Sequence, residues 1–374
     1  MTAFARVADI AQQIRGVTYA KEDATSNPRP GYLPVLRAGN IADDSLVFED
    51  LVFVPAERVA STQKIRRNDV VIAASSGSLD VVGKAARALS DFEGGFGAFC
   101  KVLRPGPGID PAYFAHFFRT REYRQRVSAL AAGANINNLR NEHLDEFRIP
   151  LPPIPEQRRI AEILDKADAL RAKRRTALAQ LDTLTQSIFL DMFGDPASNP
   201  RKWPQENLET FFYFRTGKLD SNAAVATGQY PFFTCSREDF RIDTFAFDCE
   251  ALMLAGNNAS ADYSVKHYKG KFNAYQRTYV ITLRNEHNSY DYSRFVLEQR
   301  LAELKRISKG TGTKYLTMEL LNRICIPVPP KELQGEFAWR VGAVERLRTA
   351  QRASLAELEA IFAALQHRAF RGEL

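Results

Sequence analysis

The stretch Ile149–Leu170, IPLPPIPEQRRIAEILDKADAL, has a second copy near the end of the chain, Ile326–Leu347, IPVPPKELQGEFAWRVGAVERL. Adding 177 to each residue number superimposes the prolines and most apolar positions of the two stretches. The similarity begins upstream, at Gly133 and Gly310, and continues through a segment of helical periodicity after each proline run. Each copy follows a globular segment, so the 374-residue chain alternates globule, helix, globule and helix. A chain duplicated in this way presents two similar surfaces, which suits a bipartite target.

The two segments after the proline runs are predicted to form long helices. Apolar residues recur at steps of three and four residues, which is the pattern of a coiled coil. The first stripe contains Ile160, Ile163, Ala167, Leu170, Leu181, Leu184 and Ile188, and the second contains Phe337, Val341, Val344, Leu347, Leu358, Ile361 and Leu365. Pro155 suits the first turn of a helix, and Gly194 with Pro196 is typical of a helix end.

The order of the segments predicts the direction of the helices. The second globule starts where the first helix ends and finishes where the second helix begins. Because a compact domain brings those two points together, we expect an antiparallel pair and a pseudo-twofold duplication. The predicted fold class is α+β, with two similar α/β domains joined by two long antiparallel coiled-coil helices. The predicted parts are residues 1–154 (first domain), 155–195 (central helix), 196–330 (second domain) and 331–374 (C-terminal helix).

The two globular segments share an order of short strand-like runs followed by a helix. The first has strand-like runs at 33–41, 50–54, 69–75 and 98–103 and a helix predicted at 111–130. The second has runs at 230–236, 251–256 and 276–283 and a helix predicted at 293–307. Local similarities support a common origin, since Arg15-Gly16 resembles Thr216-Gly217 and GAFCKVL (97–103) resembles NAYQRTYVITL (273–283).

The composition is that of an ordinary folded protein, with 45% hydrophobic residues, a formal net charge of +7 and a pI near 9.2. A mild basic excess is compatible with nucleic-acid binding but is weak evidence for it. The cysteines lack CxxC spacing and the histidines are dispersed, so no metal site is expected. No signal peptide is expected, because a mixed, polar segment follows Met1, and no apolar run approaches the ~20 residues that cross a bilayer. A cytoplasmic location is therefore expected.

Motifs for catalysis are missing from the sequence. There is no GxxxxGK[ST] phosphate loop, and SKGTGTK at 308–314 has the wrong spacing. DPAY at 110–113 lacks the second proline of the [DN]PP[YF] motif of amino-methyltransferases, so we interpret Asp110 as a helix N-cap with Pro111 at the first helical position. No nuclease constellation or GxSxG motif is evident. We therefore expect no catalytic residue in this chain.

Polar turns near aromatic or basic residues are the candidates for reading base edges, because Asn, Arg and Lys can make bidentate contacts to adenine or guanine. In the first globule they are Arg37, Asn40, Ser75, Ser76, Ser78, Lys84, Asn135, Asn137 and Asn138, and in the second Lys218, Asn222, Ser236, Arg237, Asn257, Asn258, Lys269, Thr311, Thr313 and Lys314. The runs Ala73–Lys84 and Ala255–Lys269 occupy corresponding places in the two copies yet differ in sequence. Two different half-sites would require such divergence, and drift in ordinary turns explains it equally well.

With these residues in view, the chain resembles the DNA specificity subunit of Type I restriction-modification systems. The run IPLPPIPEQRRIAEILDKADAL is the most specific part, and YLPVLRAGNI (32–41) and DVVIAASSG (69–77) are similar to that family's recognition-domain core. The resemblance implies two target recognition domains that each read one half of a split double-stranded DNA sequence. It implies helices that hold the domains apart and dock DNA adenine methyltransferase (modification) subunits. Restriction/translocase subunits complete such a complex, and S-adenosylmethionine, ATP and Mg would be bound by partner subunits, with none on this chain.

Two other classes remain open. One is a non-catalytic coiled-coil adaptor that binds only protein partners. The other is an enzyme whose site no motif reveals. Sequence-selective DNA binding in the presence of a methyltransferase separates the first from the favoured interpretation, and activity of the lone chain on DNA would reveal the second.

Overall fold

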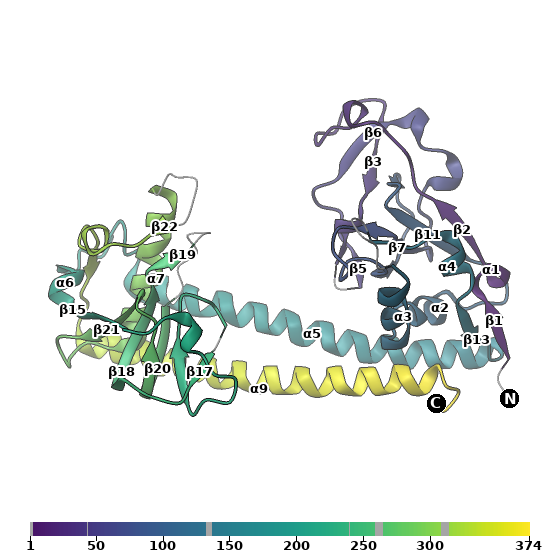
Figure 1. The fold of residues 1–374 in the computed structure, drawn as a ribbon. Helices are drawn as coiled ribbons and strands as arrows, with labels where there is room; N and C mark the ends of the chain where they lie inside the picture. Colours follow the sequence, from purple (N-terminus) through teal and green to yellow (C-terminus); the bar gives the residue numbers. More distant parts are fainter. Residues whose placement is uncertain (1–2, 43, 132–136, 239, 259–264, 308–313) are drawn as a thin grey trace. The chain divides into compact units, whose positions relative to one another are not determined.

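The computed structural model describes residues 3–42, 44–131, 137–238, 240–258, 265–307 and 314–374. The chain forms two compact units, each of which contains a globule and part of both long helices (Figure 1). Unit 1 consists of Met1–Arg175 and Ala353–Leu374, and unit 2 consists of Thr176–Arg352. The helices therefore do not form units of their own, because their apolar sides belong to the cores of the globules.

Unit 1 is built from short strands and helices before the first long helix. Its strands are β1 (Phe4–Arg6), β2 (Ala11–Arg15), β3 (Tyr32–Leu36), β4 (Ile41–Ala42), β5 (Ser45–Leu46), β6 (Val52–Pro55), β7 (Val70–Ala73), β8 (Ser75–Ser76), β9 (Ala85–Arg87), β10 (Gly95–Phe96), β11 (Cys100–Pro105), β12 (Asn137–Asn138) and β13 (Arg148–Pro150). Its helices are α1 (Val7–Ile10), α2 (Pro111–Phe117), α3 (Arg121–Ala131), α4 (Asn141–Asp145), and parts of α5 (Ile154–Phe193) and α9 (Lys331–Ala369).

A four-stranded sheet lies at the centre of unit 1, in the order β2-β11-β7-β9, and a three-stranded sheet has the order β10-β3-β6. All four residues of β7 are buried, which explains why its sequence, VVIA, is continuously apolar. One face of the sheet contributes to a core with α2, α3 and the helices α5 and α9, where Phe114, Ile160, Leu164 and Phe362 are buried. The globule and the helix pair thus share one hydrophobic core.

Unit 2 has fewer and longer strands. They are β14 (Gln205–Asn207), β15 (Phe212–Thr216), β16 (Tyr230–Phe233), β17 (Phe240–Ile242), β18 (Phe247–Ala255), β19 (Asn257–Asn258), β20 (Val265–Ala274), β21 (Thr278–Leu283), β22 (Lys314–Tyr315) and β23 (Cys325–Pro327). The short helices are α6 (Leu208–Phe211), α7 (Tyr290–Ile307) and α8 (Met318–Leu321). A six-stranded sheet runs in the order β15-β21-β18-β20-β16-β17. Its core with α5, α7 and α9 contains Phe189, Tyr292 and Phe337.

In both units, the globule is joined to its long helix by the same strand pairing and the same tyrosine hydrogen bond. Strand β1 pairs with β13 in unit 1, and β14 pairs with β23 in unit 2. A tyrosine then locks the proline run, since the hydroxyl of Tyr113 donates to the carbonyl of Pro150 at 2.8 Å and that of Tyr292 donates to Pro327 at 2.7 Å. The prolines end these edge strands and carry the chain into the helices, as the sequence predicts.

The helices α5 and α9 are antiparallel within each unit, as predicted. In unit 1, Arg175 of α5 pairs with Glu359 of α9 at 2.9 Å, while Arg159, earlier in α5, donates to the carbonyl of Leu374 at 2.6 Å. In unit 2, Arg348 pairs with Asp182 at 2.8 Å, and the Phe189 and Phe337 rings lie 5.6 Å apart. Residue numbers therefore rise along α5 as they fall along α9. Gly194 ends α5 with a positive φ of 78°, which glycine adopts without strain.

The predicted apolar stripe is only partly buried. Ile160, Leu164 and Leu181 on α5 and Phe337, Val341 and Val344 on α9 are buried. In contrast, Leu170, Leu184, Leu347 and Ile361 are 44–53% exposed, so their prediction as interhelical contacts is wrong. The buried contact in unit 1 instead uses Phe362, whose ring lies 4.2 Å from the guanidinium carbon of Arg171. Periodicity identifies the apolar stripe, but it does not show which part of the stripe a neighbouring element covers.

The helix predicted at 111–130 is divided into α2 and α3. The hydroxyl of Thr120 donates to the carbonyl of Phe117 at 2.8 Å and accepts from the backbone N–H of Tyr123 at 3.3 Å. A threonine that satisfies a free donor at a helix start acts as a cap, so it ends one helix and starts the next. The N-cap prediction for Asp110 is confirmed, because its carboxylate accepts from the N–H groups of Ala112 and Tyr113. Among the described residues, neither long helix has the apolar run needed to span a membrane.

Candidate nucleic-acid interface

In unit 1, several predicted base-reading residues meet at one end of the central sheet. Beyond the end of β7, Ser75 and Ser76 of β8 pair with Asn138 and Asn137 of β12 in a short antiparallel ladder. The ladder is joined to the sheet by backbone bonds, since Leu139 donates to the carbonyl of Ala74 at 2.7 Å. Segments more than 60 residues apart in the sequence thus form one polar edge, which is defined here as β8, β12 and the turn that precedes β11.

In unit 2 the same arrangement follows β18. Asn257 and Asn258 of β19 pair with Tyr315 and Lys314 of β22. Leu316 donates to the carbonyl of Gly256 at 2.9 Å, just as Leu139 donates to Ala74 in unit 1. The polar edge of unit 2 therefore consists of β19, β22 and the turn that precedes β21. The prediction that Ala73 and Ala255 occupy corresponding places is confirmed, because Ala73 pairs with Cys100 of β11 and Ala255 pairs with Thr278 of β21.

In each unit, one side chain donates a hydrogen bond to the backbone of the residue next to the polar edge. In unit 1, the amine of Lys101 donates to the carbonyl of Leu139 at 2.6 Å. In unit 2, the hydroxyl of Tyr279 donates to the carbonyl of Leu316 at 2.9 Å. Lys101 is 8% exposed, and burial lowers the pKa of its amine to about 8. Burial also raises the pKa of the Tyr279 hydroxyl, so this group stays protonated and can donate at neutral pH.

Two tight turns complete the polar edges. The N–H of Cys100 donates to the carbonyl of Gly97 and the N–H of Thr278 to that of Tyr275, each at 2.8 Å. Both turns lie against a glycine. A Cβ on Gly16 would lie 2.1 Å from the Gly97 oxygen.

In unit 2 the glycine is Gly217. A Cβ there would lie 1.7 Å from the oxygen of Ala274, which immediately precedes the turn. The similarity between Arg15-Gly16 and Thr216-Gly217 therefore reflects a close approach of two backbones that only glycine permits.

The turns expose two residues that sequence reasoning missed, Phe99 in unit 1 and Arg277 in unit 2. Each occupies the third position of its turn, immediately before the strand. The signal was available in the sequence, because aligning GAFCKVL with YQRTYVI places Phe99 opposite Arg277. Polarity alone does not indicate a phenylalanine in a turn as a candidate for base contact.

Arg37 and Asn40 border a pocket of about 600 Å³ that Ser75, Ser76 and Phe99 also line. Arg37 is exposed, and its guanidinium donates to the carbonyl of Asp50 at 2.9 Å. Asn40 is buried, and its amide donates to the carbonyls of Val47 and Glu49. Its side-chain oxygen accepts from the N–H of Arg37 at 2.9 Å. Asn40 therefore shapes the loop that carries Arg37.

Ser78 and Lys84 are exposed in the loop that follows β8. The guanidinium of Arg124 on α3 holds this loop, donating to the carbonyls of Val82 at 2.6 Å and Asp80 at 2.9 Å. The carbonyl of Lys84 accepts from the N–H of Ala73 at 2.9 Å, which returns the loop to the sheet. The loop that follows the polar edge of unit 1 is thus held to the unit by hydrogen bonds.

In unit 2, Lys218 and Ser236 lie close to the turn that carries Arg277. Leu219, next to Lys218, accepts from the N–H of Gln276, and the thiol of Cys235 donates to the carbonyl of Arg277 at 3.5 Å. Both Lys218 and Ser236 are exposed. Arg237 and Asn222 are exposed too, the latter in a 3-10 turn that Asp220 caps.

Lys269 lies elsewhere. The segment Ala255–Lys269 was predicted to be one strand-to-loop run, but Lys269 is inside β20, opposite Glu250. Its amine pairs with the Glu250 carboxylate at 3.1 Å, and Glu250 is five residues from Ala255, the end of β18 that leads into the polar edge. At ~3.4 Å per residue, that is roughly 17 Å along the strand. Asn135, Thr311 and Thr313 lie outside the described residues, and only the backbone of Asn137, Asn258 and Lys314 is described.

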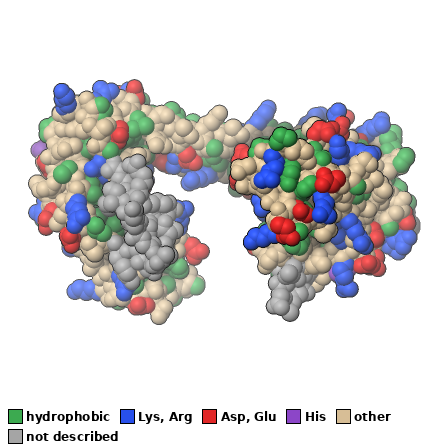
Figure 2. Space-filling model, turned by 90° about the horizontal axis from the view of Figure 1, so that it is seen from above, with side chains coloured by type: hydrophobic (Ala, Val, Ile, Leu, Met, Phe, Trp, Pro, Cys, Tyr) green, Lys and Arg blue, Asp and Glu red, His purple; other side chains and the backbone are tan. Residues whose placement is uncertain are grey.

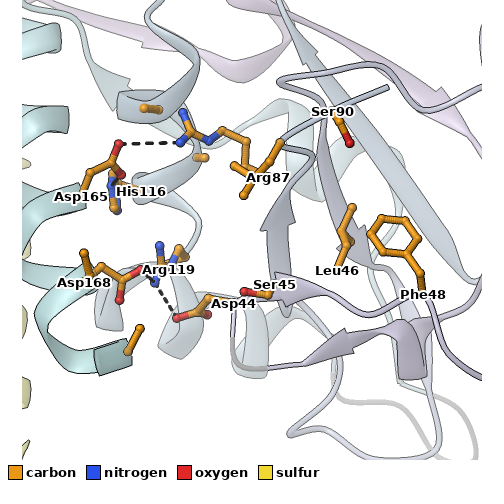
Figure 3. A pocket seen from close by; sticks show the side chains of 15 residues that line it. Asp44, Ser45, Leu46, Phe48, Arg87, Ser90, His116, Arg119, Asp165 and Asp168 are labelled. Atoms are coloured by element: carbon orange, nitrogen blue, oxygen red, sulfur yellow. Dashed lines mark hydrogen bonds and ion pairs between the residues drawn. The ribbon is translucent and has the colours of Figure 1, made fainter. Parts of the chain in front are cut away.

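A separate pocket of about 350 Å³, lined by apolar side chains and a cluster of charged ones, lies in unit 1 between the globule and α5 (Figure 3). His116 of α2 is buried, and its Nε2 lies 2.7 Å from a carboxylate oxygen of Asp165 on α5. The guanidinium of Arg119 contacts carboxylates of both Asp44 and Asp168, at 2.9 and 2.7 Å (Figure 3). Burial lowers the pKa of His116, so its ring is neutral at pH 7. The hydrogen bond between His116 and Asp165 therefore joins α2 to α5 at this pocket.

On the face shown in Figure 2, the described side chains form no patch of a single charge sign. Lys and Arg side chains alternate with Asp and Glu over the described part of the face shown in Figure 2. In the same described residues, no group of three or more His, Cys, Asp or Glu side chains could hold a metal ion. The features with the character of a binding site are therefore the two polar edges, which combine hydrogen-bonding side chains with an exposed residue on a rigid turn.

Comparison with known proteins identifies the family to which this duplicated arrangement belongs. The family model for the Type I restriction modification DNA specificity domain matches residues 3–181 and 200–360. The chain belongs to this family. The two matched segments correspond to the two copies, so the family domain occurs twice in this specificity-domain chain.

Relatives with similar sequences match part of this specificity-domain chain. The specificity subunit of the Type I restriction enzyme StySPI from Salmonella potsdam is 46% identical over 186 residues, covering 50% of this chain and 40% of that protein. The EcoKI specificity subunit from Escherichia coli strain K12 is 47% identical over 179 residues, covering 48% of this chain and 36% of that protein. The matches thus span less than half the length of these curated relatives.

Solved structures extend the similarity of fold to the whole chain. The crystal structure of a Type I restriction-modification system S subunit from M. genitalium has a TM-score of 0.61 at 16% identity, covering 98% of this chain and 96% of that one. A chain from a study of complex assembly and conformational transition in a type I restriction-modification system has a TM-score of 0.56 at 19% identity, covering 100% and 98%. The predicted α+β fold class is confirmed at this level.

Proposed function

We propose that this chain is the specificity subunit of a Type I restriction-modification complex and recognises a bipartite double-stranded DNA target. Each unit reads one half of the target through its polar edge. The observation that carries the proposal is the pair of equivalent edges with different side chains. Ser75 and Asn257 occupy the same position on the same frame, and so do Asn138 and Tyr315. Equal frames with unequal side chains suit two different half-sequences.

The proposal assigns no catalysis to the chain itself. The relatives are named specificity subunits, and the sequence holds no phosphate loop or methyltransferase motif. Methyl transfer, with S-adenosylmethionine, falls to DNA adenine methyltransferase subunits. ATP hydrolysis with Mg and DNA cleavage fall to restriction/translocase subunits. Such a complex acts on DNA in the cytoplasm.

Exposed apolar residues on the long helices support the docking of protein partners. Leu170 and Ile361 in unit 1, and Leu184 and Leu347 in unit 2, are 44–53% exposed, and Trp339 is 71% exposed. Leu170 and Leu347 are equivalent in the sequence repeat, as are Leu184 and Ile361. A duplicated apolar surface suits two copies of one partner, and the methyltransferase subunit fills this role in the proposal.

The proposal is tested by producing the chain with its methyltransferase subunits in a host that lacks adenine methylation. Mapping methylated adenines across the host genome should give a split motif with two specified halves and an unspecified gap. The methyltransferase without this chain should give none, and the chain without the methyltransferase should transfer no methyl group. A complex that forms but shows no sequence preference would favour the alternative, a coiled-coil adaptor that binds only protein.

A further inference from the structure

The turns Gly97–Cys100 and Tyr275–Thr278 hold one residue each in the same backbone position. The carbonyl of Phe99 accepts from the N–H of Ala74 at 2.8 Å, and the carbonyl of Arg277 accepts from the N–H of Gly256 at 2.8 Å. Ala74 and Gly256 are themselves equivalent, because each immediately precedes the strand that forms the polar edge. The two side chains are therefore carried by turns with equivalent backbone hydrogen bonds.

The backbone at both positions is fixed independently of the side chain. The carbonyl of Phe99 accepts a second hydrogen bond, from Ser75, at 3.0 Å, and the carbonyl of Arg277 accepts one from the Cys235 thiol. Gly16 and Gly217 lie so close to each turn that an added Cβ would be 2.1 Å from the Gly97 oxygen and 1.7 Å from the Ala274 oxygen. A side chain on such a turn can change without moving the frame, which is what a position that sets specificity needs.

The chemistry at the two positions differs completely. Phe99 is 65% exposed and lines the pocket that Arg37, Ser75 and Ser76 border. Phe48, another exposed ring of unit 1, packs on Phe92 with centroids 5.0 Å apart and so has a structural partner of its own. Arg277 is exposed and carries a planar guanidinium, and its backbone is hydrogen-bonded to Gly256, the residue before Asn257 of β19. An aromatic ring contacts the methyl group of thymine, whereas a guanidinium makes two parallel hydrogen bonds to guanine.

We propose that Phe99 and Arg277 set the difference in base preference between the two units. Phe99 contacts the 5-methyl group of a thymine in the half-site of unit 1, and Arg277 binds O6 and N7 of a guanine in the half-site of unit 2. This inference rests on the proposed function and adds two residues and two bases to it.

The test uses the full chain in complex with its methyltransferase subunits and selects duplex DNA from a randomised pool. Phe99→Ala should relax one base pair of one half-site, and Phe99→Arg should change that base pair to a preference for guanine. Arg277→Ala should relax one base pair of the other half-site, with affinity for the wild-type motif falling roughly tenfold or more. Phe99→Leu keeps an apolar contact and should retain the original preference.

Two matched controls separate readout from general effects. Leu89→Ala removes a large exposed apolar side chain from unit 1 outside its polar edge. Lys271→Ala removes an exposed cation from β20, opposite Asp248 and outside the polar edge of unit 2. Both should leave the motif unchanged. Replacing thymine by uracil in the half-site of unit 1 removes only the methyl group, so it should weaken the wild-type complex and leave Phe99→Ala unaffected.

The outcomes distinguish the two levels of the proposal. If the wild-type complex enriches no motif, the proposed function is overturned, and this inference with it. If the wild-type complex enriches a split motif but the Phe99 and Arg277 variants enrich the same one, only this inference is overturned. A change in both half-sites from a single substitution would also overturn it, because the two residues belong to different units.

Discussion

The buried amine of Lys101 donates a 2.6 Å hydrogen bond to the main-chain carbonyl of Leu139, and in unit 2 the hydroxyl of Tyr279 makes the equivalent bond to Leu316 at 2.9 Å. Leu139 and Leu316 are partners in the sequence repeat, whereas lysine and tyrosine have little in common. What the two copies retain is a long side chain that places a hydrogen-bond donor under the polar edge.

Removing either donor should weaken its own polar edge. Lys101→Met leaves the Leu139 carbonyl without this donor, and Tyr279→Phe does the same to Leu316. Each change should cost about 1–3 kcal/mol of unfolding free energy, measured by urea denaturation. Lys101→Tyr should retain more stability than Lys101→Met because it imitates unit 2. Equal losses for the two Lys101 variants would contradict a role as donor.

The stability contribution of Lys101 should depend on pH in the alkaline range. Burial lowers the pKa of its amine to about 8 in the folded chain, from 10.5 when exposed. Between these values the unfolded chain binds the proton and the folded chain does not, so folded stability rises with pH. The wild type should therefore gain unfolding free energy relative to Lys101→Met from pH 8 to pH 10. Parallel pH profiles of the two proteins would count against this explanation.

Gly16 and Gly217 should tolerate no side chain. The added Cβ would lie 2.1 Å from the Gly97 oxygen in one case and 1.7 Å from the Ala274 oxygen in the other, and both neighbours are backbone. Gly16→Ala and Gly217→Ala should each cost about 1–3 kcal/mol or more, seen as a lower melting temperature. Gly77→Ala is the control, since nothing lies within 4 Å of its Cβ position. A control that destabilised as much as Gly16→Ala would refute the steric argument.

The buried glutamines at the start of the two long helices, Gln157 and Gln334, should contribute to the stability of their units. The side-chain oxygen of Gln157 accepts from the N–H of Asp110 at 2.9 Å, and its amide donates to the carbonyl of Pro152 at 2.8 Å. Gln334 makes the same pair of bonds with Ser289 and Pro329. Replacing either by leucine leaves a backbone donor and a backbone acceptor without this partner, at sites that are at least partly buried. Each replacement should cost roughly 1–3 kcal/mol.

Calorimetry of these two single variants provides the measurement. Gln157→Glu is a useful companion, because it retains the acceptor for Asp110 but loses the donor to Pro152. A leucine variant as stable as the wild type would show that the repeat preserves this glutamine for another reason.

His116 should make unit 1 sensitive to mild acid. Burial lowers the pKa of the ring below its ordinary value of 6.5, against the opposing effect of the Asp165 carboxylate, with Asp168, Arg119 and Arg87 also facing the pocket. The unfolded chain therefore takes up a proton first as pH falls through 6.5, and folded stability falls with it.

Phe295 is the counterpart of His116 in unit 2, three residues after Tyr292 as His116 is after Tyr113, and it packs against Phe337 with ring centroids 5.3 Å apart. His116→Phe should therefore fold, and it should lose less melting temperature than the wild type between pH 7.5 and pH 5.5. The pKa of Asp165 is held below its ordinary value by the histidine, so this carboxylate titrates outside that window. An identical pH response in both proteins would exclude His116 as the cause.

Charges placed on the exposed helix residues should weaken partner binding without unfolding the chain. Leu170→Glu with Leu347→Glu changes two repeat-equivalent positions that are 51% and 49% exposed. The circular dichroism spectrum and melting temperature should stay near the wild-type values, while affinity for the methyltransferase falls by tenfold or more. Glu162→Lys changes an exposed charge on the same helix and serves as the control. Unchanged affinity in the double variant would place the docking surface elsewhere.

The sequence by itself determined the architecture, because the information was local or repeated. The 177-residue repeat, the proline runs and the heptad steps predict two globules and two antiparallel helices, and the Asp110 cap depends on neighbours three residues away. Tertiary structure decided which side of each helix is covered, since Leu170 and Leu184 belong to the predicted stripe yet remain exposed. It also decided the composition of the polar edges, where Asn138 meets Ser75 and Phe99 lies beside them. These contacts arise from pairing between strands that are distant in the sequence, and local periodicity does not determine which strands pair.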